Sequence, residues 1–535
     1  MSRDVHRSKG LDKKSRLSRR DFLKAAGVLS AGAAIQPALI SLPGSGRKNV
    51  IVVVLDALSA GHLSLHGYAR ETAPNITKLA QQAVVYHRHY APCNWTGPST
   101  ASLLTGTYPW THRAVHMNEG VAGEFRNKNL FAVLPDHSAV AYTHNPMAAA
   151  VLERFPDVKG GLISPDALYL TSTSLPRGLF EADRAQAELG WGRIFHKTSN
   201  GGYAYSLLWS DVQRFLNARR AAGLEAEFPR GLPGHAGDNY FLLEDAIDYF
   251  SSDLRRRESP FLAYLHFFPP HSPYNSRAEF VDTFANDGLE FPGKPRGLFT
   301  TPAAYYHGWL PRNTKMTAPF LAEMRRQYDE YILYADSEFG RFWDSLDVSG
   351  LLKDTWVVLT SDHGELFERG MLGHSQPAFF EPEMRVPLLI FEPGRTERVD
   401  VEIPTSTVDV LATLLNVSGQ PVAEWSEGVV LPPYANSEAD ASRSVFAASS
   451  LIRPAPERQA AGPRAGSLMH VQGRHKLIYH YGYRQLKTAR ERVELYDVVD
   501  DPEELQDLSE SMQARAEELL EPLRPLREVF QSNPG

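Results

Sequence analysis

An unbroken apolar run, "VIVVVLD" at residues 50–56, constrains the fold of this chain more than any other segment. A strand with one face in water alternates apolar and polar side chains, and this run does not alternate. Continuous β-branched runs are typical of strands buried on both faces, as in parallel sheets that carry helices on each side. The run therefore predicts the first strand of an α/β domain.

Strand-like and helix-like segments then follow one another along the chain. Three more apolar runs are typical of strands, at residues 260–268, 355–362 and 386–393. Three segments with helical patterns have start or stop signals, at residues 73–83, 319–346 and 406–419. This alternation predicts a doubly wound, mostly parallel central sheet flanked by helices, over about residues 47–425.

Three further regions depart from this pattern. Residues 160–245 and 283–317 are rich in Gly, Pro and aromatic residues, and we interpret them as insertions over one edge of the sheet. They either shape a substrate pocket or only pack on the surface. Residues 426–535 predict a smaller C-terminal α+β subdomain, with strands near "RHKLIYHY" and "RVELYDVV" and a helix after Pro502.

The first 46 residues predict an export signal and a linker. Arg19 and Arg20 stand before an apolar, small-residue stretch that runs from Ala25 to about Leu42. This order is typical of the twin-arginine pathway, so we expect the twin-arginine translocase as a partner and a periplasmic or other extracytoplasmic location. A basic tail before a buried helix is the structural alternative. An uncleaved stretch of about 18 apolar residues would nearly span a bilayer and tether the protein to the membrane.

The rest of the chain is acidic and almost free of cysteine. Residues 1–24 hold nine Lys and Arg against three Asp and Glu, so the net charge of −7 becomes −13 without them. An acidic body argues against nucleic acid as a partner. The single cysteine excludes an intrachain disulfide, also in an oxidising compartment.

Polar residues gather where the predicted strands end. Asp56 ends the first apolar run, His271 follows the second, and Asp362 and His363 end the third. The carboxyl ends of strands meet at one edge of an open α/β sheet. Two carboxylates and an imidazole there suit a divalent metal ion with an open coordination position. Each residue alone could be a helix cap or a structural histidine, so the prediction depends on their shared placement.

The segment "APCNWTGPSTASLLTG", residues 91–106, offers three nucleophiles: Cys93, Thr96 and Ser99. Pro98 predicts a helix start, which places Thr96 just before a helix N-terminus, where free N–H groups and the dipole favour an anion. A hydroxyl becomes a good nucleophile only when a metal or a base removes its proton, and the predicted metal site would do this for Thr96. The structural alternative is that Thr96 is only an N-cap.

Several motifs occur in an order that resembles the sulfatase family of the alkaline phosphatase superfamily. They span roughly residues 48–508 and include "NVIVVVLDALSAGHLSLHGY", "TAPNITKLAQQAVVY", "GPSTASLLTGTYP", "HSPY", "SDHGE", "GHSQPAFFEPEMRVPLLI" and "ELYDVVDDPEELQDL". One such motif is moderately specific, and seven in order are strongly so. The resemblance implies an alkaline phosphatase-like fold and hydrolysis of an anionic ester.

The resemblance also sets the register of the nucleophile loop. Sulfatases carry Cys-x-Pro-x-Arg, whose cysteine is oxidised to formylglycine, and Thr96 aligns with that cysteine. Cys93 lies three residues too early, and we interpret it as a small packed hydrophobe. Thr100 replaces the arginine of the motif, and Ala57 replaces the second aspartate of many sulfatases. These departures resemble the threonine-nucleophile branch, so no formylglycine is expected, and zinc or manganese is favoured over calcium, which stays possible.

By this resemblance each candidate residue receives a role. The implied metal ligands are Asp56, Thr96, Asp362 and His363, with Thr96 as the nucleophile. Two further catalytic residues, His271 and His374, contact the free oxygens of the anion or protonate the leaving group. Substrate contacts are implied for Asn145 and Thr100. Either catalytic histidine could instead hold a loop.

Four functions remain open from the sequence. A threonyl ester cannot expel its anion by simple elimination, so water or an acceptor alcohol must attack the intermediate. This favours a hydrolase of phosphate diesters or phosphonate monoesters, and a sulfatase on a sulfated glycan or small molecule is the first alternative. A phosphoethanolamine-type transferase and a catalytically inactive glycan-binding protein are the others. The expected substrate is accordingly a small anionic ester or a sulfated or phosphorylated glycan.

Overall fold

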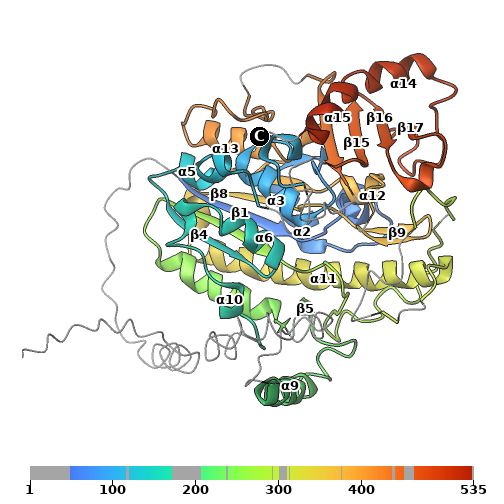
Figure 1. Ribbon diagram of the computed structural model, residues 1–535. Helices are drawn as coiled ribbons and strands as arrows, with labels where there is room; N and C mark the ends of the chain where they lie inside the picture. The colour runs from blue at the N-terminus through green and yellow to red at the C-terminus, as the bar shows by residue number, and fades with distance from the viewer. Residues whose placement is uncertain are drawn as a thin grey trace, which may run out of the picture. The chain divides into compact units, whose positions relative to one another are not determined.

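A computed structural model describes residues 48–115, 120–171, 207–235, 239–291, 293–300, 310–311, 314–374, 376–435, 440–450 and 463–532. All of them belong to one compact unit, residues 47–535. Figure 1 shows its central sheet between two layers of helices, with a second sheet formed by the C-terminal strands. The predicted signal, residues 1–46, lies outside the described residues, as do Trp191 and Trp309 and the side chain of Trp209.

The central sheet confirms the predicted mixed, mostly parallel architecture. Only β11 runs against its neighbours among the seven described strands, since it pairs antiparallel with both β2 and β8. The strands lie in the order β12 (Val399–Val401), β2 (Val84–Tyr86), β11 (Leu388–Phe391), β8 (Thr355–Thr360), β1 (Asn49–Leu55), β7 (Phe261–Phe267) and β4 (Ser138–Thr143). β1 therefore lies between two parallel partners near the middle of the sheet.

Strand β1 is buried on both faces, as its sequence predicts. Ile51, Val53 and Leu55 pack in one apolar core, and Val50 and Val52 pack in another on the opposite face. The first core is covered by α2 (Pro74–Leu79), α10 (Leu243–Asp253) and α11 (Ala318–Val348). The second is covered by α3 (Thr96–Thr105), α5 (Leu130–Val133), α6 (Pro146–Leu152) and α13 (Asp409–Val417). Both layers are visible in Figure 1.

The C-terminal sheet is antiparallel and contains more strands than the sequence indicated. The predicted pair is β16 (His475–Tyr481) and β17 (Glu491–Asp497), and two strands extend it, β15 (Gly466–Gln472) and β14 (Ser444–Ser449). Helices α14 (Gln513–Leu520) and α15 (Leu523–Gln531) follow. The helix expected after Pro502 thus begins only at Gln513, because Asp501 and Asp507 accept backbone N–H groups and hold turns before it.

A buried ion cluster joins this sheet to the α/β part. The ammonium of Lys476, on β16, is fully buried and lies 2.8 Å from Glu381 Oε1 and 2.6 Å from Glu504 Oε1. Glu381 begins α12 (Glu381–Met384), and its backbone N–H donates to Glu504 Oε2. Opposite charges keep each other ionised here although all three groups are out of water.

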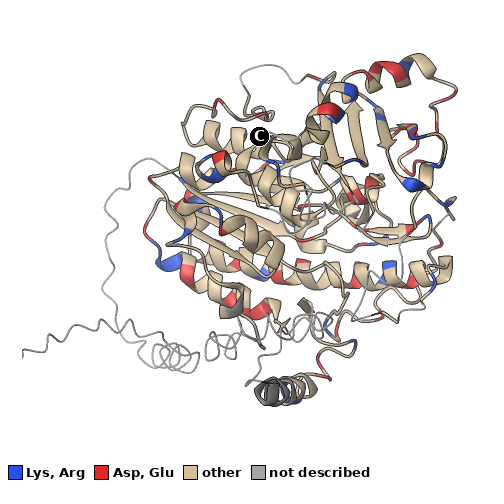
Figure 2. Ribbon diagram, viewed as in Figure 1, with Lys and Arg blue, Asp and Glu red and all other residues tan. Residues whose placement is uncertain are grey.

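The other described α-helices and strands lie outside these groups. They are the helices α4 (Pro109–His112) and α9 (Leu207–Ala222), the pairs β3 (His89–Tyr90) with β13 (Thr405–Ser406) and β5 (Gly234–His235) with β6 (Asn239–Tyr240), and the hairpin β9 (Leu366–Glu368) with β10 (Met371–Gly373). Acidic and basic residues are interspersed along the helices (Figure 2). Among the described helices, none is both long and apolar enough to cross a membrane.

Candidate active site

The predicted site residues meet at the carboxyl ends of β1, β7 and β8. Asp56 follows β1 directly, and Asp362 and His363 come two and three residues after the end of β8. The backbone turns sharply after Asp56, since Ala57 has φ +62°, a value that costs a non-glycine residue about 1–2 kcal/mol. Two hydrogen bonds hold this turn: Ala57 N–H donates to Asp362 Oδ1, and the Tyr328 hydroxyl donates to the Ala57 carbonyl.

Asp56, Asp362 and His363, hereafter the Asp56 cluster, each present one lone-pair atom to a common centre. Asp56 Oδ1 and Asp362 Oδ2 are buried and have no hydrogen-bond partner among the described residues. His363 Nε2 lies 3.9 Å from the first and 3.5 Å from the second. His363 Nδ1 donates to the Gly364 carbonyl at 3.1 Å, so Nε2 carries the lone pair. Three such atoms within 4.8 Å of one another could hold a metal ion.

Thr96 lies against this cluster, in the first turn of α3. Its Oγ1 is 3.3 Å from His363 Nε2, and the residue is 2 % exposed. The helix begins at Thr96 itself, two residues earlier than predicted, because Pro98 in its first turn needs no N–H partner. Thr96 is therefore not the N-cap, which is Trp95. The Thr96 hydroxyl, the N-terminus of α3 and the lone pairs of the Asp56 cluster therefore lie close together.

Asn145 connects the hydroxyl with the carboxylates. Its Nδ2 donates to Asp56 Oδ2 at 2.6 Å and to Thr96 Oγ1 at 3.2 Å. Its Oδ1 accepts the N–H of Met147 and caps α6. The sequence indicated only a substrate contact for this residue, whereas the structure gives it two protein partners within the site.

His266 is a member of the site that the sequence analysis missed. It lies on β7, fully buried, and its Nε2 is 3.1 Å from Asp56 Oδ2. Burial alone would lower the pKa of this imidazole, but the hydrogen bond and the charge of Asp56 outweigh it, so the pKa is raised. The sequence signal that could have identified His266 is its position as a polar residue inside the apolar run "FLAYLHFF".

The two carboxylates of the Asp56 cluster differ in their electrostatics. Burial and the charge of Asp362 raise the pKa of Asp56. Burial would also raise the pKa of Asp362, but the neighbouring imidazoles of His363 and His266 lower it to about 2. Asp362 is therefore ionised, and a second negative charge beside it requires a compensating positive charge.

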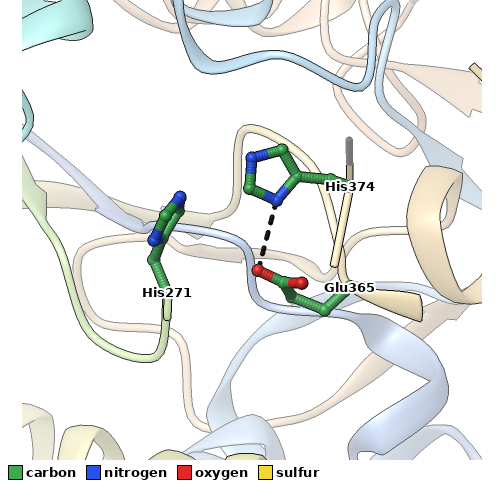
Figure 3. A group of neighbouring side chains, drawn as sticks. All are labelled: His271, Glu365 and His374. Carbon is green, nitrogen blue, oxygen red and sulfur yellow. Dashed lines mark hydrogen bonds and ion pairs between the residues drawn. The ribbon is translucent and has the colours of Figure 1, made fainter. Parts of the chain in front are cut away.

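A second group, His271, Glu365 and His374, is shown in Figure 3 and is hereafter the Glu365 cluster. It adjoins the first. The rings of His374 and His363 have centroids 4.0 Å apart. His374 Nδ1 lies 3.2 Å from Glu365 Oε1, and the Tyr274 hydroxyl donates to Glu365 Oε2 at 3.3 Å. The carboxylate therefore has a protein partner at each oxygen. Glu365 stands in the motif "SDHGE", yet the sequence analysis assigned it no role.

The protonation of the Glu365 cluster differs from that of the Asp56 cluster. Burial raises the pKa of Glu365 to about 8 and lowers the pKa of His374 to about 4, so at neutral pH the pair keeps one transferable proton. Burial and the nearby imidazole of His374 lower the pKa of His271 well below its usual value. His271 Nδ1 donates to the Ser272 carbonyl at 2.8 Å, which leaves its Nε2 as an acceptor.

The other candidates of the nucleophile loop lie away from both clusters. Cys93 is fully buried, and burial raises the pKa of its thiol to about 12, so it is not a thiolate nucleophile. Ser99 donates its hydroxyl to the Cys93 carbonyl at 2.7 Å. Thr100, one turn after Thr96, is 1 % exposed and lies beside the Tyr264 hydroxyl beneath the site. No hydrogen bond or ion pair of the described residues joins Thr100 to either cluster.

Comparison with known proteins identifies the family. The family model described as sulfatase matches residues 48–420, which is more than half of the chain. The chain belongs to the sulfatase family. As a member of this family it is a hydrolase of ester bonds. A second model, the twin-arginine translocation pathway signal sequence, matches residues 16–35, so the sulfatase-family chain is exported by that pathway.

Individual relatives are distant but cover most of the chain. Choline-sulfatase of Rhizobium meliloti is 26 % identical over 87 % of this chain and 83 % of its own length. The multifunctional alkaline phosphatase superfamily protein PehA of Trinickia caryophylli is 24 % identical over 72 % and 77 %. The crystal structure of the phosphonate monoester hydrolase of Agrobacterium radiobacter superposes with a TM-score of 0.63 and 20 % identity, over 90 % of this chain and 95 % of its own. The last similarity establishes the fold.

Proposed function

We propose that this sulfatase-family protein is a metal-dependent hydrolase in which Thr96 attacks phosphorus, with phosphate diesters or phosphonate monoesters as the favoured substrates. The observation that carries the proposal is the position of the Thr96 hydroxyl, 3.3 Å from His363 Nε2 and beside two unpartnered carboxylate oxygens. A hydroxyl placed only for packing or capping would not require bare buried carboxylates next to it.

The donor set fits a resident divalent metal ion. Asp56 Oδ1, Asp362 Oδ2 and His363 Nε2 would hold it, with Thr96 Oγ1 as a further ligand. Hydrogen bonds to Asp56 Oδ2 and Asp362 Oδ1 fix the other carboxylate oxygens, as is usual around metal ligands. Two oxygen donors and one imidazole favour zinc or manganese, and calcium remains an option. When bound, such an ion lowers the pKa of a hydroxyl and neutralises charge on the transferred group.

The protein groups around Thr96 account for the first step of the reaction. Thr96 gives its hydroxyl proton to solvent water, the Asn145 amide N–H stabilises the resulting oxygen, and a Thr96 Oγ1–phosphorus bond forms while the ester bond to the leaving oxygen breaks. His271 and the first turn of α3 bind the free oxygens of the anion. The proton shared by Glu365 and His374 passes to the leaving oxygen.

The second step regenerates the enzyme. Water attacks phosphorus, the Thr96 Oγ1–phosphorus bond breaks, and Thr96 takes a proton back from solvent. One proton of the attacking water restores the protonated Glu365–His374 pair. A formylglycine hydrate can release its anion by elimination, but threonine cannot. In this protein, water must therefore attack the phosphorus or sulfur atom of the intermediate. This favours phosphorus esters, and a relative named phosphonate monoester hydrolase is consistent with it.

Sulfate ester hydrolysis is the second candidate. A choline-sulfatase is 26 % identical over most of this chain, so a small sulfate ester is a plausible substrate chemistry for the same site. Both candidates use the same hydroxyl, and they differ only in the central atom that is attacked.

The test is a substrate screen on matched variants. Nitrophenyl sulfate, nitrophenyl phosphate, bis-nitrophenyl phosphate and nitrophenyl phenylphosphonate are compared for kcat/KM. We expect bis-nitrophenyl phosphate and nitrophenyl phenylphosphonate to have the highest kcat/KM. We expect Thr96→Ala to lower kcat by about 10³-fold or more when it is compared with wild type at equal metal content. Ser99→Ala is the control, since its hydroxyl only bonds a backbone carbonyl. Full activity of Thr96→Ala would refute the proposal, and a faster sulfate ester would reverse the substrate preference.

A further inference from the structure

A cavity outside the catalytic clusters lies where the tip of the β9–β10 hairpin meets the start of α11. Its volume is about 220 Å³. The hairpin contributes Phe367, Glu368, Arg369 and Gly370, and α11 contributes residues from Ala318 to Arg325. The segment around Lys294 closes a further side. No step of the proposed reaction uses any of these residues.

The charges that line this cavity are unbalanced. Its cations are Lys294, Arg296, Arg325 and Arg369, and its lining contains one carboxylate, Glu368. Glu368 is shared: its Oε2 lies 2.8 Å from Lys294 and 3.5 Å from Arg325, and its Oε1 lies 3.3 Å from Arg369 Nε. Glu503 adds one more negative charge through its ion pair with Lys294. In and around the cavity, four positively charged side chains therefore face two negatively charged ones.

Two of these cations keep unused hydrogen-bond donors. The Nε group of Arg325 is buried without a hydrogen-bond acceptor among the described residues, and the Nε group of Arg369 has only its ion pair with Glu368, which lacks hydrogen-bond geometry. Arg369 is 5 % exposed, and its side chain is held in place because Nη2 donates to the carbonyls of Glu503 and Glu504. A buried guanidinium N–H without an acceptor costs free energy, which a bound oxygen anion would recover.

The helix start adds a further favourable element. Thr317, the N-cap of the 31-residue helix α11, lines the cavity and makes no side-chain cap hydrogen bond. The first N–H groups of a helix lack intrahelical acceptors and carry partial positive charge. Arg325 also lies over the ring of Phe291, 4.3 Å from its centroid, which fixes the guanidinium at the cavity wall.

We infer that this cavity is a second anion site, which binds a sulfate, phosphate or carboxylate group. The hairpin links it to the active centre, since Glu365 and His374 flank its two three-residue strands, a separation of about 10 Å. The anion is either the second acidic group of the substrate or a free ion. The first source rests on the proposed function, and the anion site itself does not.

The direct test locates an ion in crystals of the purified protein soaked with sodium selenate, a sulfate analogue with an anomalous signal. We expect one peak in the cavity of the wild type and none in Arg325→Gln. The matched control is Arg326→Gln, one residue further along α11, because the two side chains are similarly buried, 12 % and 16 % exposed, and Arg326 is already paired with Glu323 and Glu330. Selenate only at Thr96, or an unchanged cavity peak in Arg325→Gln, would overturn the inference.

A solution measurement keeps the test independent of folding defects. Arg296→Gln removes an exposed cation of the cavity, so the fold should tolerate it. Calorimetric titration with sodium sulfate at low ionic strength should show about tenfold weaker binding at one of two sites, for the loss of one charge-assisted hydrogen bond. Equal sulfate binding in Arg296→Gln, Arg325→Gln and the wild type contradicts the inference.

Kinetics then distinguish the two sources of the anion. A nitrophenyl phosphonate ester is compared with the same ester bearing a distant carboxylate. A KM that rises about tenfold in Arg325→Gln for the dianionic ester alone assigns the site to the substrate, and equal KM values with weakened sulfate binding assign it to a free ion. If no ester is hydrolysed, the proposed function fails, while the selenate and sulfate results still decide the anion site.

Discussion

The Asp56 cluster and the Glu365 cluster adjoin each other and combine carboxylates and imidazoles in opposite proportions, two carboxylates with one imidazole in the first and one carboxylate with two imidazoles in the second. In the Asp56 cluster two carboxylate oxygens have no hydrogen-bond partner among the described residues, and an imidazole lone pair faces them. In the Glu365 cluster both carboxylate oxygens already have partners, His374 and Tyr274. Because its carboxylate oxygens are free, we expect a metal ion in the Asp56 cluster, and we expect the Glu365 cluster, whose carboxylate is already paired, to hold a proton.

The largest effect should come from metal removal. We expect one zinc or manganese ion per chain, held by the Asp56 cluster, and loss of activity when a chelator removes it. Asp362→Asn should weaken metal binding by more than the 10- to 100-fold typical of outer residues, because a direct ligand is lost. Elemental analysis of both proteins is the measurement. Two ions per chain would show that the Glu365 cluster also binds metal and would remove the distinction.

Glu365→Gln should have the next largest effect, with no change in metal content. The variant keeps the shape of the side chain but cannot hold the shared proton, so kcat should fall by about 10²-fold. The wild type should lose activity as pH rises through about 8, because the raised pKa of Glu365 marks the loss of that proton. The variant should lack this alkaline limb. An identical pH–rate profile in the two proteins would exclude a role of Glu365 in proton transfer.

Asn145→Ser tests the connection between Thr96 and the Asp56 cluster. Serine retains the acceptor that caps α6 but loses the amide that donates to Asp56 Oδ2 and Thr96 Oγ1. We expect a 10-fold or somewhat larger loss of kcat or metal affinity, as for other residues that orient metal ligands. Thermal unfolding serves as the control and should change little. Unchanged kinetics would mean that Asn145 is only a helix cap.

The smallest effect is expected for Tyr274→Phe. The hydroxyl of Tyr274 donates to Glu365 Oε2 over a long 3.3 Å contact, and this bond stabilises the ionised carboxylate. Its loss should raise the pKa of Glu365 further and move the alkaline limb upward by at most about one pH unit. Metal content should not change. A downward shift of the limb would show that the hydrogen bond is directed differently.

Much of this architecture could be predicted from local sequence. The run at residues 50–56 indicated a strand buried on both faces because its apolar side chains do not alternate, and the strand-end rule placed Asp56 beside Asp362. The family resemblance, rather than spacing, set Thr96 as the nucleophile. Its assigned role stays a prediction, although the structure places its hydroxyl beside His363.

Other features could not be predicted because they depend on non-local packing. His266 looked like one polar residue in an apolar strand, and its contact with Asp56 arises from the pairing of β1 with β7. Glu365 stands in the motif "SDHGE", but its two partners come from other parts of the chain. Tyr274 lies in a separate loop, and His374 follows the end of β10. The anion cavity unites Lys294, Arg325 and Arg369, which no sequence period relates.

The fully buried ammonium of Lys476 has a consequence for how the protein is made. A chain terminated after α13 would lose one of the two cations beside the buried carboxylate of Glu381, because Lys476 would be missing and only Arg385 would remain, and loss of a partner from a buried ion pair typically costs 3–5 kcal/mol. The twin-arginine pathway transports proteins that have already folded. The C-terminal strands must therefore be synthesised and folded before the protein leaves the cytosol. Truncated versions prepared for the bench should accordingly be cut beyond Glu504 and not ahead of it, because Glu504 also pairs with Lys476.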